Sequence, residues 1–524
     1  MSAETGPRVL TEMRHTPMRS TCPCLLVLLL VCGPLPGAPA APKPLAAEAM
    51  VSQNKHSTDN PIDRAPSSGP DVTFHFQPEG RLFGDPIPFY HEGIHHVFYL
   101  RGWGWQHLAS RDLVTWKQLP GTGITGATGS IVNKDGLFYL FYNGNAANTR
   151  AVCLATSRDL VTWTNSEQNP LLRLDRDVPD DVYDTSKDWR DPHVFWNPEE
   201  QKWWMAVAAM ERTNGAYGPA GAVACATSAD LLHWTVERKP MLLDRDSNAG
   251  ECPDVFPFGA GWALIYYPDA SRIRLADSPR GPWRRPKNDA PSGLYFNAGK
   301  TEFDGKRHIW HGYMARLAKD YDSHQPQGVM ALPRELYLDA AGNPAVRLVP
   351  EIVAACSQDA TGGAGGMVFT PLLKSSVRAT VDSVVVEAGP GDHALALWQN
   401  APEDFFLSTD VTLDEGCQLT LYFRSNSKVD DSYILRIDAL NSEVSFHHCK
   451  GWNRMSPMNA RALEIPKNQS FKLHVMLHGD VFEAFLDDRI AMSSRVQLPK
   501  GSLAISARDG RAELKNLKIT HLPR

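Results

Sequence analysis

A short unit recurs in the first part of the chain and constrains the fold more than any other feature of the sequence. The copies are HLASRDLVTWKQL at 107–119, LATSRDLVTWTNS at 154–166, CATSADLLHWTVE at 225–237 and the shorter LADSPRGPW at 275–283. Their aligned serines lie 47, 71 and 50 residues apart, which is the length of a four-stranded propeller blade with insertions. The repeat therefore predicts the blades of a β-propeller.

The segments between the repeats have the composition of short β-strands. They are aromatic or β-branched, and Gly, Pro, Asn or Asp bounds each of them, as in HHVFYL at 95–100 and WALIYY at 262–267. Within the repeat, we expect Ser and Asp to hydrogen-bond nearby backbone in a tight turn while Leu and Trp pack between blades. Trp116, Trp163 and Trp234 are thus predicted to be packing residues.

The chain divides into two predicted folded units. A five-bladed propeller is expected over 71–350, followed by a Gly-rich linker over 351–374 that contains TGGAGG. The remainder, 375–524, holds alternating strand-length runs such as QLTLYFRS and FKLHVMLH, which are typical of an antiparallel β-sandwich. The predicted fold class is all-β, a five-bladed propeller followed by a sandwich.

The N-terminal residues have the order of a secretory signal peptide. Arg14 and Arg19 precede the apolar run 25–31, and the small residues Ala38 and Ala40 follow. The run is shorter than the roughly 20 residues that span a bilayer, which disfavours a membrane anchor. We therefore expect residues 1–40 to be removed from a secreted or extracellular protein, with 41–70 as a flexible lead-in.

The charge balance and the motifs exclude several classes of function. The chain has 53 Lys and Arg against 59 Asp and Glu, a net charge of -6, which argues against nucleic acid as a partner. The cysteines are too scattered for metal-ligand spacing, and the acidic run 175–184 lacks the ligand spacing of a calcium loop. No metal or organic cofactor is predicted.

Three carboxylates lie at or just before short apolar strands, at similar positions in different blades. Asp85 lies in LFGDPIPFY, Asp191 in KDWRDPHVF and Glu251 in AGECPDVFPF. The innermost strands of a propeller converge on its axis, so these side chains are expected to meet there. Convergent carboxylates raise at least one pKa, which allows one group to hold a proton while another stays ionised. Such a cluster can therefore supply both an acid and a nucleophile.

These motifs resemble those of glycoside hydrolase family 32, the invertase, inulinase and levanase group. The order and spacing of LFGDPIPFY, ATGSIVNKDGLFYLFYNG, WRDPHVF, ECPDVFPF, FNAGKTEFDGKRHIWHGY and MALPREL carry the resemblance over roughly 71–350. The resemblance implies a retaining β-fructofuranosidase acting on a carbohydrate of the sucrose or fructan type. It implies Asp85 as nucleophile, Glu251 as general acid and base, and Asp191 as transition-state stabiliser. The substrate contacts are expected from Arg190, Ser130, Trp105 and Trp310.

The first motif departs from the family pattern. Leu82, Gly84, Ile87 and Pro88 replace a Trp, an Asn and a final Asn-Gly, Leu100 replaces a Gln, and Asn297 replaces a Tyr. Loss of hydrogen-bonding groups that line the sugar pocket in family members is expected to change sugar recognition more than the reaction class.

Two other functions remain open from the sequence. One is an inverting arabinan or xylan hydrolase on the same propeller, whose carboxyls stand about 6.5–9.5 Å apart rather than about 5–5.5 Å. The ECPD motif and the C-terminal sandwich count against it. The other is a secreted sugar-binding protein that keeps the carboxylates without turnover.

Overall fold

The computed structural model describes residues 60–522 apart from short segments, which are 80–82, 147–148, 214–219, 246–249, 316–327, 359–361, 364–365, 374–375, 452–454, 467–468, 497 and 499–500. The predicted signal peptide, 1–40, and most of the predicted lead-in lie outside the described residues.

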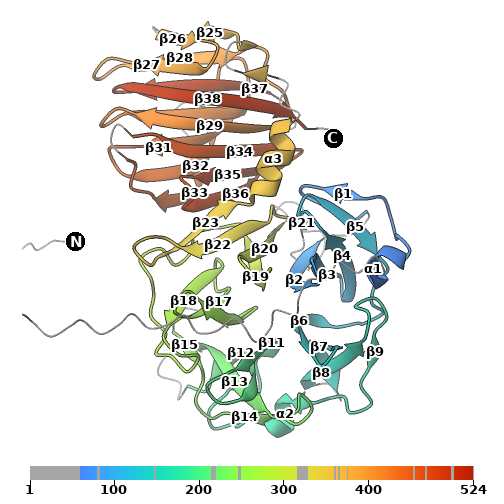
Figure 1. The fold of residues 1–524 in the computed structure, drawn as a ribbon. Helices are drawn as coiled ribbons and strands as arrows, with labels where there is room; N and C mark the ends of the chain where they lie inside the picture. Colours follow the sequence, from blue (N-terminus) through green and yellow to red (C-terminus); the bar gives the residue numbers. More distant parts are fainter. Residues whose placement is uncertain are drawn as a thin grey trace, which may run out of the picture. The chain divides into compact units, whose positions relative to one another are not determined.

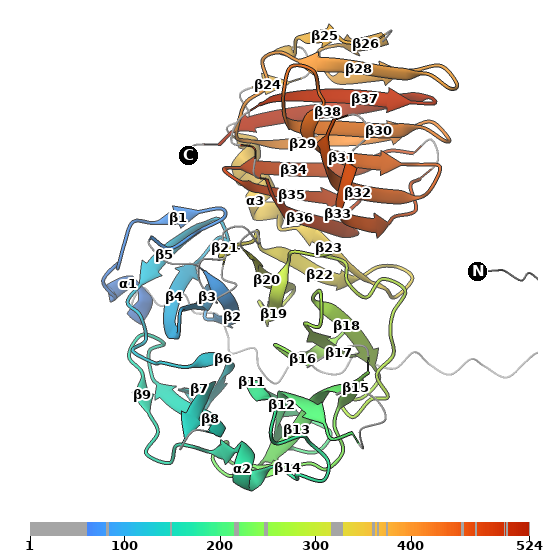
Figure 2. The same cartoon turned by 180° about the vertical axis from the view of Figure 1, so that it is seen from behind.

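Five antiparallel sheets form a ring of blades, which Figures 1 and 2 show from opposite sides. Blade 1 contains β1 (Val72–Thr73), β2 (Gly84–His91), β3 (Ile94–Arg101), β4 (Gly104–Ser110) and β5 (Thr115–Leu119). Blade 2 contains β6 (Ala127–Lys134), β7 (Leu137–Ala146), β8 (Thr149–Ser157), β9 (Thr164–Asn165) and β10 (Leu172–Arg173). Blade 3 contains β11 (Trp189–Asn197), β12 (Lys202–Glu211), β13 (Ala220–Ser228), β14 (Thr235–Val236) and β15 (Leu242–Asp244).

The last two blades complete the ring. Blade 4 contains β16 (Asp254–Phe258), β17 (Gly261–Tyr266) and β18 (Arg272–Ala276). Blade 5 contains β19 (Asn297–Phe303), β20 (His308–Ala315), β21 (Gly328–Met330), β22 (Arg334–Leu338) and β23 (Pro344–Leu348). The ring closes where the chain before β2 meets β21, because Phe83 and Gly328 exchange backbone hydrogen bonds of 2.7 and 2.6 Å. The predicted five-bladed propeller is confirmed.

The repeated Ser-x-Asp-Leu unit forms the predicted tight turn at the end of a strand. In blade 2, Ser157 accepts a hydrogen bond from the Leu160 amide at 2.9 Å, and Asp159 accepts from the Thr162 amide at 2.7 Å. Leu160 adopts a positive φ of 62° and packs in the core between blades, where Trp163 is also buried. The same bonds recur around Ser110 and Ser228. The repeat is therefore structural, as predicted.

Two sheets follow the propeller and form the predicted sandwich. One contains β24 (Gly362–Gly363), β26 (Ser376–Ala379), β27 (Ser383–Glu387), β29 (Phe405–Leu413), β34 (Phe471–His478), β35 (Val481–Leu486), β36 (Ile490–Arg495) and β38 (Arg511–His521). The other contains β25 (Phe369–Pro371), β28 (His393–Trp398), β30 (Gln418–Ser425), β31 (Asp431–Asp438), β32 (Glu443–Lys450), β33 (Met455–Ala462) and β37 (Ser502–Arg508). Their inner faces share one apolar core, in which Phe446 stacks on Phe482 with ring centroids 4.1 Å apart.

The segments that were predicted as a flexible lead-in and as a linker contain helices or strands. The end of the predicted lead-in forms α1 (Pro61–Arg64), where Asn60 caps the helix and Ile62 is buried against blade 1. The predicted linker, 351–374, contains most of α3 (Pro350–Gln358) together with β24 and β25. Ile352 and Cys356 of α3 are buried in the core. The segment therefore packs against the rest of the fold, which its Gly-rich composition did not indicate. A further short helix, α2 (Leu174–Asp177), lies in the acidic run.

Candidate active site

Four of the five innermost strands carry a bulge near their first residues. The pairing register shifts between Gly84 and Ile87 in β2, between Ala127 and Gly129 in β6, between Arg190 and His193 in β11, and between Asn297 and Lys300 in β19. Proline lacks the amide hydrogen that a regular ladder needs, so the two Asp-Pro pairs favour the bulges in β2 and β11. A bulge redirects side chains, and here it lets Asp85 and Asp191 leave the regular alternation of their strands.

Glu251 and Asp191 contact one guanidinium, that of Arg190, and Asp85 lies within electrostatic reach of it. Arg190 donates a hydrogen bond from Nη2 to Glu251 Oε1, and its Nε lies 3.4 Å from Asp191 Oδ2. The Cys252 amide donates to the same Asp191 oxygen at 3.0 Å. Asp85 lies near enough for its charge and that of Asp191 to act on each other. The structure thus brings together the three carboxylates that the sequence singled out.

Asp85 is held from the neighbouring blade. Its Oδ2 accepts a hydrogen bond from the hydroxyl of Thr128, which the bulge of β6 exposes to it. Burial and the nearby charge of Asp191 raise the pKa of Asp85, whereas the Thr128 hydroxyl and the Lys300 ammonium lower it. Thr128 was not singled out from the sequence, although it lies two residues before Ser130 in the motif that contains both.

Glu251 is far more accessible than Asp191, with 41% of its side chain exposed against 5% for Asp191. Burial raises the pKa of Glu251, Arg190 opposes this, and the charges of Asp191 and Asp85 add to the rise. A carboxyl whose pKa is raised beside other carboxylates, and which is open to solvent on one side, is suited to donating a proton.

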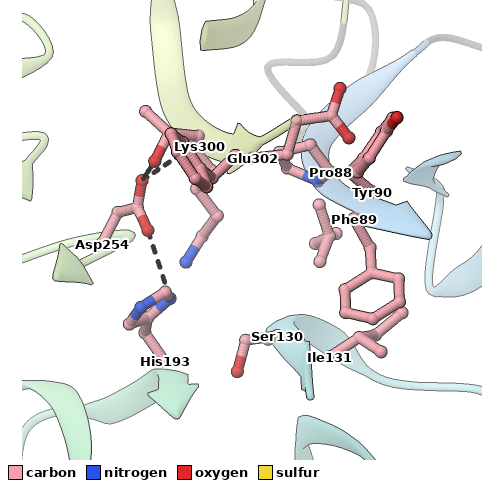
Figure 3. A pocket seen from close by; sticks show the side chains of 13 residues that line it. Pro88, Phe89, Tyr90, Ser130, Ile131, His193, Asp254, Lys300 and Glu302 are labelled. Atoms are coloured by element: carbon pink, nitrogen blue, oxygen red, sulfur yellow. Dashed lines mark hydrogen bonds and ion pairs between the residues drawn. The ribbon is translucent and has the colours of Figure 1, made fainter. Parts of the chain in front are cut away.

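A cavity of about 210 Å³ lies farther along the same innermost strands, and Figure 3 shows its lining. Lys300 extends into it toward His193 and donates to the Pro253 carbonyl at 2.8 Å. The three carboxylates are not among its lining residues. Ser130, a predicted substrate contact, is buried here and its hydroxyl accepts from the Val194 amide at 2.9 Å, so it ties blade 2 to blade 3.

The two tryptophans predicted to contact substrate are fully buried. Trp105 has no exposed surface and donates to the Ala127 carbonyl at 3.2 Å, and Trp310 packs edge-on against Phe296. Neither ring offers a face to a sugar in this structure, so we assign both to packing. Trp103, in the turn between β3 and β4, is instead exposed, with 61% of its surface accessible. Its carbonyl accepts from the Gly126 amide at 2.8 Å, two residues before Thr128.

Two departures from the family pattern have structural explanations. Leu100 is buried in the apolar core between blades 1 and 2, an environment that does not require a polar side chain. Asn297 accepts a hydrogen bond from the hydroxyl of Tyr267 and donates to the Tyr313 carbonyl at 3.1 Å. The Tyr267 amide in turn donates to the Glu251 carbonyl at 2.9 Å. Asn297 and Tyr267 thus brace the backbone that carries Glu251.

The described residues contain no group of His, Cys, Asp and Glu side chains arranged to hold a metal ion. Among the same residues, no helix is long and apolar enough to cross a membrane. The six cysteines from Cys153 onward are all buried.

Comparisons with known proteins agree with this fold and these motifs. A model of the glycosyl hydrolases family 32 N-terminal domain matches residues 75–347. A β-fructofuranosidase, insoluble isoenzyme 6, from Oryza sativa is 30% identical over 38% of this chain and 36% of its own length. A levanase from Bacillus subtilis is 31% identical over 35% of this chain and 28% of its own. The matched region thus spans well under half of these relatives' lengths.

Solved structures resemble nearly the whole described chain. Fructan 1-exohydrolase IIa from Cichorium intybus superposes with a TM-score of 0.63 at 15% identity, covering 87% of this chain and 98% of that one. A β-fructofuranosidase from Bombyx mori gives a TM-score of 0.62 at 18% identity, covering 86% and 94%. At these identities the likeness concerns the fold, and it includes the sandwich as well as the propeller.

Proposed function

Because the chain belongs to glycosyl hydrolase family 32, we propose that it hydrolyses β-fructofuranosides of the sucrose or fructan type by a retaining mechanism. The observation that carries the proposal is the cluster around Arg190, in which a partly buried Asp85 and an accessible Glu251 act on each other electrostatically. The relatives named β-fructofuranosidase and levanase support the substrate class.

The proposed reaction has two steps. A carboxylate oxygen of Asp85 attacks the anomeric carbon of the fructosyl unit, and the leaving oxygen takes the proton of Glu251 as its bond to that carbon breaks. Glu251, now ionised, then removes a proton from water, whose oxygen attacks the same carbon and releases Asp85. Asp191 holds ring hydroxyls and stabilises the positive charge of each transition state. The mechanism requires the carboxyls of Asp85 and Glu251 about 5–5.5 Å apart.

The test is a screen of purified protein on sucrose, inulin, levan and arabinan, with Asp85→Asn as the matched inactive variant. Fructose release by the wild type alone supports the proposal. Adding methanol then distinguishes the stereochemistry, because a retaining enzyme transfers the fructosyl unit to give methyl β-fructofuranoside. Release of arabinose without fructose would instead favour the inverting arabinan hydrolase. Sugar binding without turnover in the wild type would favour the binding protein.

We also propose that the protein is secreted after removal of residues 1–40. The order of Arg14 and Arg19, the apolar run 25–31 and the small residues Ala38 and Ala40 supports this. Expression in a secreting host, followed by sequencing of the N-terminus, should find a mature chain that begins near Ala41. Intracellular protein with an intact N-terminus would contradict it.

A further inference from the structure

A chain of alternating charges runs from the surface to Glu251. Arg150, in the second position of β8, places Nη1 3.3 Å from Asp188 Oδ1, and the other oxygen of Asp188 accepts a hydrogen bond from Arg190 Nη1. Arg190 then donates from Nη2 to Glu251. The side chain of Arg150 is 43% exposed and that of Asp188 is 12% exposed. Cation and anion therefore alternate over four residues from three blade segments.

Asp188 fixes the plane of the Arg190 guanidinium. A guanidinium presents its donors in a rigid fork, so one anchored nitrogen sets the direction of the others. Asp188 binds Nη1, which leaves Nη2 for Glu251 and Nε toward Asp191. Asp188 precedes β11 by one residue and lies only two residues before Arg190, so the orientation is set locally.

We propose that Arg150 and Asp188 are positioning residues that set the orientation and the effective charge of Arg190, and thereby the pH range in which Glu251 carries its proton. The inference rests on the proposed function for its kinetic consequence, because Glu251 is the group that donates the proton there. Neither Arg150 nor Asp188 needs to contact the sugar. They act on the reaction through Arg190.

The other titratable groups near Glu251 do not take over the effect of Arg190 on the pKa of Glu251. Asp191 of β11 and Asp85 of β2 raise the pKa of Glu251, and both remain unchanged in the variants below. Tyr267, Tyr313 and Cys252 also lie within electrostatic reach of Glu251, and burial raises the pKa of each above its usual value. They are therefore neutral across the working pH range. The charge of Arg190 and its hydrogen bond are the largest influences that favour the ionised form of Glu251.

Substitutions of Asp188 and of Arg150 should shift the pKa of Glu251 in opposite directions. Asp188→Asn keeps an oxygen for Arg190 but removes the negative charge that offsets it, so the pKa of Glu251 falls. Arg150→Gln leaves Asp188 without its outer cation, so Asp188 offsets Arg190 more and the pKa of Glu251 rises. The alkaline limb of the pH profile of kcat/KM reports ionisation of the acid. It should move down in Asp188→Asn and up in Arg150→Gln, each by on the order of half a pH unit.

The experiment measures kcat/KM against pH for the wild type, both variants and the double variant. The double variant should shift as Asp188→Asn does, because Arg150 acts through the charge of Asp188. Asp175→Asn is the control, because it removes the acidic partner of the exposed Arg173 ion pair and should leave both limbs in place. Thermal melting checks that each variant folds. Shifts of the same sign, or lower rates without any shift, would overturn the proposal and leave Arg150 and Asp188 a structural role only.

A second readout does not depend on turnover. Protein labelled with carbon-13 at the glutamate carboxyl allows Glu251 to be titrated directly, and the Glu251→Gln spectrum identifies its signal. If the wild type cleaves no fructoside, the proposed function fails while this titration still tests the charge chain. Opposite shifts of the Glu251 pKa in the two variants support the inference, and equal titration curves refute it.

Discussion

At the scale of single residues, Asp85 is the position where the loss of one charge should matter most. Asp85→Asn keeps the size and most of the hydrogen bonding but removes the group that attacks the anomeric carbon. We expect kcat to fall by several orders of magnitude while affinity for the fructoside changes little, because the loss is confined to the transition state. Steady-state kinetics with calorimetric binding measures both. An equal loss in binding and rate would contradict the nucleophile assignment.

The companion carboxylates should behave differently from Asp85. Glu251→Gln should spare fructosides with good leaving groups at the first step, since these need less protonation. Asp191→Asn should weaken both binding and rate, because its proposed contacts tighten as positive charge develops. Comparing sucrose with an aryl fructoside separates these outcomes. Equal losses on both substrates in Glu251→Gln would argue against its role as acid.

Thr128 offers a test of how the ionised form of Asp85 is maintained. Its hydroxyl donates to the carboxylate and thereby lowers the pKa of Asp85 against burial and Asp191. Thr128→Val removes this bond, so the pKa of Asp85 rises and the acid limb of kcat/KM should move to higher pH by about one pH unit. Thr122→Val is the control, because Thr122 is also buried but bonds the Trp105 carbonyl. An unmoved acid limb would mean that the bond has no part in ionisation.

The convergence of the three carboxylates could be predicted from the sequence, but the surroundings of the cluster could not. Asp-Pro and Glu-Cys-Pro-Asp are local patterns, and convergence follows once the blades are recognised. Trp105 and Trp103 differ by two positions, and no local pattern decides which ring the turn exposes. The exposure depends on where β3 ends and β4 begins, and the buried ring is the one that lies within β4. Arg150 and Asp188 meet only through the packing of β8 against β11.

At the scale of elements, the repeated turn should contribute measurable stability. Asp159 accepts from the Val161 and Thr162 amides at 2.9 and 2.7 Å. Asp159→Ala leaves these donors without their partner, and we expect the free energy of unfolding to fall by about 1–2 kcal/mol. Urea unfolding followed by tryptophan fluorescence measures the change. Asp181→Ala is the control, since it breaks only an exposed pair with Arg238 and should leave the free energy of unfolding nearly unchanged.

Sequence patterns predicted the turns of the blades but not the strand pairing in the segment 351–374. The repeat predicted blade turns correctly because the turn's hydrogen bonds are local and its residues are specific to it. The segment 351–374 was predicted as a linker from its glycines, yet Gly362 and Gly363 pair with β38, more than 150 residues later. Pairing over that distance depends on the assembled sandwich, which composition alone does not encode.

At the scale of the whole molecule, the propeller and the sandwich share a buried ion cluster. Glu483 of β35 accepts from Arg334 of β22, from His75 at 3.0 Å and from the Leu332 amide at 2.7 Å. Arg334 is fully buried, and its guanidinium lies over the ring of Phe296. Replacing one member of such a buried pair leaves an uncompensated charge, which typically costs about 3–5 kcal/mol.

Glu483 should therefore make stability depend on acidity. Burial alone would raise the pKa of Glu483, but Arg334 and His75 outweigh it and lower the value to about 2. A carboxyl whose folded pKa lies below its unfolded value of about 4.3 stabilises the fold above that value and ceases to do so as the pH falls toward 2. Glu302 behaves in the same way. Burial alone would raise its pKa, but His95 and His311 lower it to about 2. We expect the free energy of unfolding to decrease from pH 5 to pH 3.

Glu483→Gln separates the contribution of this cluster to the pH dependence of stability from the contribution of Glu302. The variant should lose several kcal/mol at pH 7, by about the range expected for a broken buried pair, and its stability should decline less steeply below pH 5. Urea midpoints at pH 7, 5 and 3.5 give both quantities. Glu387→Gln is the control, because its pair with Arg378 is exposed and should matter little at any pH. If the acid dependence of Glu483→Gln equals that of the wild type, the cluster does not titrate with unfolding, and Glu302 and other carboxyls must account for it.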